Sequence, residues 1–150
     1  MIKKLFRSQA GTAMIEFALL TPAFALLFMG IVEFGRYGTY AILAQGAALA
    51  GANYGSANLI TAADINGMES WATNDAQYLP APITVNAKHL CSVNGSLPPT
   101  GCVFGAAAPV NTVYYVQVTV SANYTPWIAY PGIPGTITVS GSNYLRVAMQ

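Results

Sequence analysis

The sequence predicts an α+β protein whose long N-terminal helix is anchored in a membrane. Three observations support this fold class. Of the 150 residues, 54% are hydrophobic and only 7% are charged, where about 25% is usual. The run Phe17–Val32 holds no ionisable side chain. After Pro80 the apolar residues no longer recur with helical spacing but at every second position, as in a strand. We therefore expect a long helix, a short second helix and a small antiparallel β-sheet of about three strands.

Residues 1–11 form a basic leader in front of the apolar run. Lys3, Lys4 and Arg7 all precede it, so the positive-inside rule places the N-terminus in the cytoplasm and the rest of the chain outside. Residues 13–35 are long enough for one membrane crossing. Glu33 and Arg36 end the run, and they either mark its outer boundary or link to a partner helix.

The helix is expected over residues 12–52, half in the membrane and half exposed beyond it. Pro22 lacks a backbone donor and predicts a kink near Ala18. Small residues recur at Ala47, Gly51 and Gly55 and allow close helix packing. They pack either against other subunits or against the chain's own globular domain, and the sequence leaves both open.

Residues 53–80 are expected to form a linker and the short helix. Thr61 and Asp64 have the spacing of a capping-box variant that would open this helix. Its apolar side, which we expect in the core, comprises Ile65, Met68, Trp71, Ala72 and Leu79.

Residues 81–150 are expected to form the antiparallel sheet, because three segments alternate apolar and polar residues. Gly141 interrupts the last one and predicts a bulge. Cys91 and Cys102 lie on the external side, where an oxidising compartment favours a disulfide. Two thiols and His89 do not make a zinc set, so no metal site is predicted.

An apolar, proline-rich loop, Pro126–Gly135, joins the last two strands. Exposed apolar loops mark contact sites. Trp127 and Tyr130 are therefore candidates for contact with a partner or with the membrane surface. The alternative is that the loop folds back over the edge of the sheet.

The composition gives no sign of an enzyme. His89 has no neighbouring acid or nucleophile motif, and beyond Gly51 the acids are Asp64, Glu69 and Asp75, without a paired-carboxylate spacing. No glycine-rich phosphate loop occurs, so neither a catalytic residue nor a cofactor is predicted. A net charge of +1 gives no general attraction to nucleic acid.

The most informative segment is Gly11–Phe17, which places Glu16 at the start of the apolar run. A carboxylate at a helix centre in hydrocarbon costs about 2.5 to 3.5 kcal/mol on insertion scales and needs a partner. The spacing resembles the type IV prepilin signal. That resemblance implies cleavage between Gly11 and Thr12 by a prepilin peptidase. It also implies that Glu16, with Phe17 beside it, pairs with the new N-terminal amine of a neighbouring subunit.

Three segments, Ala10–Leu20, Gly30–Arg36 and Gly51–Tyr54, resemble the TadE-like family of pilin-like proteins of the tight adherence (Tad) pilus. The resemblance implies a minor pilin or pseudopilin in the bacterial inner membrane. It further implies contacts with membrane lipid, other pilin-like subunits and the pilus assembly machinery, in a homo-oligomer or a filament. Two alternatives stay open: a membrane-anchored extracytoplasmic binding module, and the main subunit of a filament.

Overall fold

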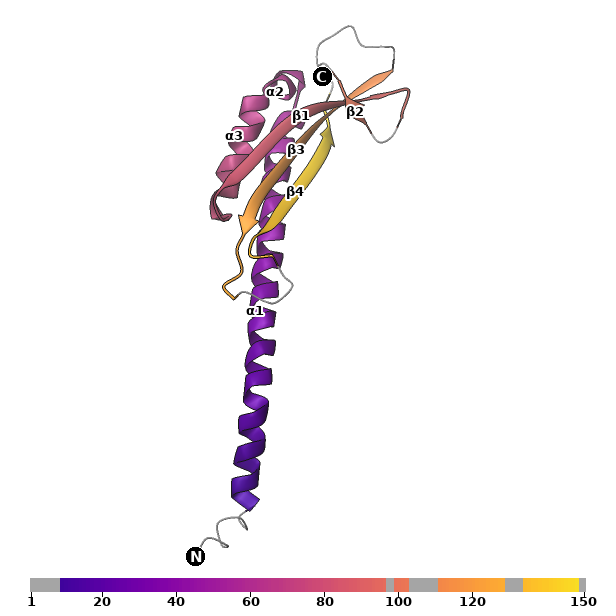
Figure 1. Ribbon diagram of the computed structural model, residues 1–150. Helices are drawn as coiled ribbons and strands as arrows, with labels where there is room; N and C mark the ends of the chain where they lie inside the picture. Colours follow the sequence, from indigo (N-terminus) through magenta and orange to yellow (C-terminus); the bar gives the residue numbers. More distant parts are fainter. Residues whose placement is uncertain (1–8, 97–98, 103–110, 129–133, 149–150) are drawn as a thin grey trace, which may run out of the picture. The chain divides into compact units, whose positions relative to one another are not determined.

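The computed structural model describes residues 9–96, 99–102, 111–128 and 134–148. The α+β class is confirmed, with a sheet of four strands instead of about three because Thr100–Gly101 adds a short strand. The elements in chain order are α1 (Gln9–Ser56), α2 (Leu59–Ala63), α3 (Ile65–Asp75), the 3-10 helix η2 (Ala76–Tyr78), β1 (Ile83–Val93), β2 (Thr100–Gly101), β3 (Thr112–Tyr124) and β4 (Ile137–Arg146) (Figure 1).

The chain divides into two compact units, Met1–Arg36 and Tyr37–Gln150. The described part of the first unit is helical throughout. Pro22 lies inside α1 without ending it, and the Thr21 hydroxyl donates to the Phe17 carbonyl at 2.7 Å. This helix is long and apolar enough to span a membrane, and none of its most apolar window is buried by protein.

The second unit is built on a sheet with strand order β2-β1-β3-β4, in which all neighbouring strands are antiparallel. The central strand, β3, turns Val116, Val118 and Val120 into the core, where each is fully buried. The opposite face is polar: Gln117 donates to the Ser142 hydroxyl, which also hydrogen-bonds the Thr119 hydroxyl. One face of the sheet is therefore covered and the other meets solvent, as in many antiparallel sheets.

The covered face packs against the second part of α1, which presents alanine and glycine. Ala44, Ala47, Ala48 and Ala52 are fully buried. A Cβ at Gly51 would lie 2.7 Å from the Met68 carbonyl oxygen of α3 and 3.2 Å from a Val118 methyl of β3. The small residues of this part of α1 therefore pack within the chain's own domain, between α3 and the sheet, which decides the alternative that the sequence left open.

Gly141 is not a bulge, because the register of β3 and β4 runs without a break through the pair Val120–Gly141. A Cβ at this position would overlap the main chain of α1 at Ala44 and Gln45. Gly141 lies in the middle of β4, where glycine is needed because the strand approaches α1 closely. Next to it, the Asn143 amide donates to the main-chain and side-chain oxygens of Gln45, each at 3.0 Å.

The first short helix begins before Thr61, the residue expected to open it. Asn58 is the N-cap of α2 and accepts from the Thr61 amide, while the Thr61 hydroxyl accepts from the Asn58 amide. Asp64 then caps α3 by accepting from the Gly67 amide at 2.9 Å. The predicted capping box of Thr61 and Asp64 is therefore wrong, because the two residues serve successive helices.

The apolar side of α3 is buried only in part. Met68 and Ala72 are fully buried and Leu79 nearly so, as expected. Trp71 is 56% exposed, and its ring stacks on Tyr54 at 5.8 Å between centroids. Its assignment to the core is wrong, because alanine and glycine on α1 leave too little depth for an indole between the two helices.

The contact at Gly141 yields a first prediction. Gly141→Ala should lower the free energy of unfolding by about 1–3 kcal/mol, since a methyl group there overpacks against main chain. Gly101→Ala is the matched control, because a Cβ at that strand glycine meets no atom within 4 Å. Thermal unfolding of the detergent-solubilised chain measures both. Equal midpoints for the two variants would contradict the direct packing of β4 on α1.

Candidate functional site

Glu16 lies on α1, in the first unit, with its side chain exposed. Thr12 precedes it by one helical turn, so the two positions share a face. Phe17 beside it is 70% exposed. Among the residues that the structure describes, no group pairs with the Glu16 carboxylate. The basic leader cannot be placed, since residues 1–8 lie outside the described part of the chain.

The surface around Glu16 is apolar on every side of the helix. The large exposed side chains of this stretch are Met14, Ile15, Leu19, Leu20, Phe24, Leu26, Leu27, Phe28, Ile31 and Val32. A helix that is hydrophobic all round belongs in lipid or inside an assembly. In either environment an isolated carboxylate is costly, so Glu16 needs a cation from outside the described chain.

Glu33 and Arg36 form an ion pair at the other end of the apolar run. Arg36 Nη1 lies 3.2 Å from one Glu33 carboxylate oxygen and 3.3 Å from the other. Glu33 is only 7% exposed. The pair compensates both charges within one turn of α1, whereas no described cation lies beside Glu16.

The second unit begins with an aromatic cluster that the sequence analysis did not identify. Tyr37 and Tyr40, on α1, contact the ring of Tyr124 at the end of β3, with centroid distances of 5.9 and 5.7 Å. Trp127 follows on the chain and is 69% exposed. Tyr130, the other predicted contact residue, lies outside the described residues. Tyrosines that directly follow an apolar span are the signal that could have indicated this cluster.

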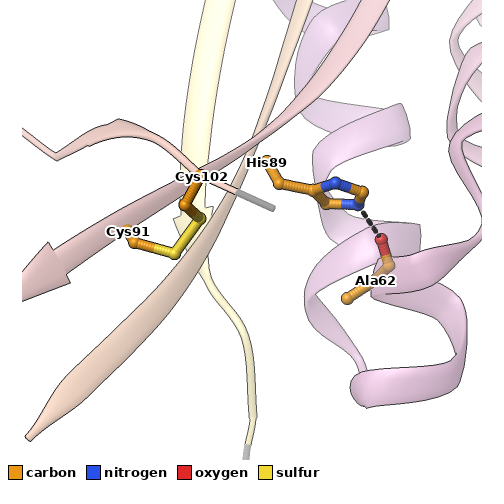
Figure 2. The surroundings of a disulfide bond; sticks show 4 residues. All are labelled: Ala62, His89, Cys91 and Cys102. Atoms are coloured by element: carbon orange, nitrogen blue, oxygen red, sulfur yellow. Dashed lines mark hydrogen bonds between the residues drawn. A yellow bond between two sulfur atoms is a disulfide. The ribbon is translucent and has the colours of Figure 1, made fainter. Parts of the chain in front are cut away.

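The two cysteines form the predicted disulfide, with their Cα atoms 5.7 Å apart. It joins β1 to the segment after β2 (Figure 2). His89, on β1, has its Nε2 atom 2.6 Å from the Ala62 carbonyl oxygen, which ties the sheet to α2. Within the described ranges, no three side chains of the types that bind metals come together.

Two acids of the second unit hold structural contacts. Glu69 accepts a hydrogen bond from the Ala87 amide of β1 at 3.1 Å. Asp64 accepts from the Tyr54 hydroxyl at 2.9 Å. This hydrogen bond raises the pKa of Tyr54 above its usual value of 10.0, with smaller contributions from lost hydration and from the negative charge of Asp64.

The comparisons with known proteins concern α1. Residues 11–53 match the family model of TadE-like protein. This match confirms the resemblance seen in the sequence. It contains Glu16, the Glu33–Arg36 pair and the buried alanines of α1 that pack against the sheet. Neither the curated proteins nor the solved structures gave a significant match. The similarity to this family therefore rests on the segment 11–53, and the sheet is described by its own geometry alone.

The disulfide gives a second prediction. Its loss through Cys91→Ser with Cys102→Ser should reduce the free energy of unfolding by about 3 kcal/mol, because the unfolded chain regains the freedom of a short closed loop. Denaturant unfolding of wild type and the double variant, in oxidising buffer, measures the difference. A reductant should lower the stability of the wild type alone. A variant as stable as the oxidised wild type would contradict a stabilising bridge.

The Tyr54–Asp64 hydrogen bond gives a third prediction. The folded state holds the proton of Tyr54 more tightly than the unfolded state, so its stabilising effect is complete below pH 10 and declines as pH rises through the raised pKa. Tyr54→Phe removes this effect. The difference in unfolding free energy between wild type and Tyr54→Phe should therefore shrink above pH 10. A difference that stays constant would rule out the coupling.

Proposed function

We propose that the chain is a pilin-like component for assembly of a Tad-type adhesive pilus and that it acts by helix packing, not by chemistry. One observation carries this proposal: the Glu16 carboxylate, which pairs with no group of the described residues, lies on an exposed apolar helix, five residues after Gly11. The match of residues 11–53 to TadE-like protein supports it as well. More specifically, we propose that it is a minor pilin or pseudopilin.

Cleavage between Gly11 and Thr12 by a prepilin peptidase would create the missing cation. The new ammonium group would stand one helical turn before Glu16, about 6 Å away along the helix axis. When copies or related subunits lie side by side, the ammonium of one can reach the carboxylate of the next. Pairing removes two isolated charges from hydrocarbon, so it favours lateral association of parallel helices.

The proposed orientation places the N-terminus in the cytoplasm and residues 37–150 outside the inner membrane. The basic residues Lys3, Lys4 and Arg7 before the span support this orientation. The disulfide agrees with it, since such bonds persist in oxidising compartments.

We assign an accessory role because the second unit is a folded domain in its own right. Tyr37–Gln150 has its own buried core and a four-stranded sheet. The structural contacts of Glu69 and Asp64 support a role without catalysis. The copy number of the chain in isolated fibres distinguishes an accessory subunit from the main one.

The decisive experiment compares processing with assembly. Glu16→Ala should still be cleaved, giving a mature chain that starts at Thr12 by mass spectrometry, but should reduce surface fibres at least tenfold. Thr21→Ala is the matched control, because it removes another polar group from the same span, one that bonds only the carbonyl of its own helix. The control should assemble normally.

Two outcomes would overturn the proposal. A purified wild-type chain that still begins at Met1 would exclude a processed pilin-like protein and favour the membrane-anchored binding module. Normal fibres from Glu16→Ala would exclude the pairing role of the carboxylate.

A further inference from the structure

We infer that one end of the second unit, formed by Tyr37, Tyr40 and Trp127, rests in the headgroup region of the membrane that α1 crosses. The partner of this surface is the outer leaflet of the lipid bilayer. The inference rests on the membrane anchorage in the proposed function, but it concerns a different part of the chain and has its own test.

The aromatic cluster fixes where the end of β3 lies. Tyr37 follows directly after Arg36, which ends the apolar run. The rings of Tyr37 and Tyr40 hold Tyr124 within 6 Å between centroids, and Tyr124 is only 3% exposed. The last residue of β3 is therefore held at the first turn of the second unit, where α1 leaves the predicted span.

Trp127 stays close to this point. Three residues of chain reach at most about 10 Å, so the backbone of Trp127 lies within that distance of Tyr124. Its indole is 69% exposed. Tryptophan and tyrosine concentrate at the level of lipid headgroups, where an apolar ring and a polar N–H or O–H group are both accommodated. Tyr37, Tyr40 and Trp127 have the composition of such an aromatic belt.

The charge pattern favours lipid over water at this end. The described residues next to this point, from Tyr124 to Ile128, include no charged side chain. Entry into the headgroup region therefore requires no charge to be desolvated. The nearest charges on α1, Glu33 and Arg36, already neutralise each other.

Trp71 provides an internal comparison. It stacks on Tyr54, which lies about four helical turns, or roughly 20 Å, beyond Tyr40 on α1. It is exposed to a similar extent, 56% against 69%. The two tryptophans therefore differ in distance from the predicted span much more than in exposure.

The test uses the full chain reconstituted in phosphatidylcholine vesicles that contain lipids brominated near the headgroup end of the acyl chains. Trp71→Phe leaves Trp127 as the only tryptophan, and Trp127→Phe leaves Trp71. Bromolipid should quench the fluorescence of Trp127 at least twofold more than that of Trp71. Flotation with the vesicles on a density gradient verifies insertion, and circular dichroism verifies that both variants are folded.

The outcomes separate the inference from the proposed function. Equal quenching of the two tryptophans, or no quenching of Trp127 in chains that float with vesicles, would overturn the lipid contact and leave a protein partner as the occupant of this surface. Chains that fail to float would overturn both the lipid contact and the membrane anchorage. A normal Glu16→Ala fibre phenotype, by contrast, would leave the quenching result untouched.

Discussion

The packing of α3 and the sheet directly on the main chain of α1 determines the fold of residues 37–150. Four alanines of α1 are fully buried, and four glycines stand where a Cβ would overlap a neighbour: Gly51 and Gly55 on α1, Gly67 on α3 and Gly141 on β4. Small residues reduce the separation between elements, so dispersion contacts form between backbones as well as side chains. The valines of β3 fill the space that remains between the sheet and the helices.

The same helix has the opposite composition in the first unit. Large apolar side chains are exposed there, and the helix has no protein cover over its most apolar window. A single helix thus contains one part that packs within its own chain and one part that requires lipid or other subunits. The family match covers both parts, whereas the sheet lies outside it.

Periodicity was sufficient to predict the class of the fold. The uninterrupted apolar pattern indicated one long helix, and the alternation of Val116, Val118 and Val120 with polar residues indicated a half-buried strand. Pattern alone could not assign Gly141 correctly, because a glycine in a strand signals either a bulge or a close approach. Trp71 was misplaced for a related reason: helical spacing gives the direction of a side chain but not the depth available to it.

The candidate site divides in the same way. Glu16 and the Glu33–Arg36 pair could be found from the sequence because they interrupt an apolar run. The contact of Tyr37 and Tyr40 with Tyr124 joins residues more than eighty positions apart. Such a contact depends on where β3 packs along α1, and no local sequence pattern specifies that position.

The bond from the Ala87 amide to Glu69 has a consequence for how copies of this protein associate. That amide points out of the sheet at the β1 edge, and the carboxylate occupies the place that a carbonyl of an added strand would take. A foreign strand would have to displace a charged acceptor to extend the sheet there. Association of copies through this sheet edge is disfavoured. Ordered aggregation, which exposed sheet edges promote, is disfavoured as well.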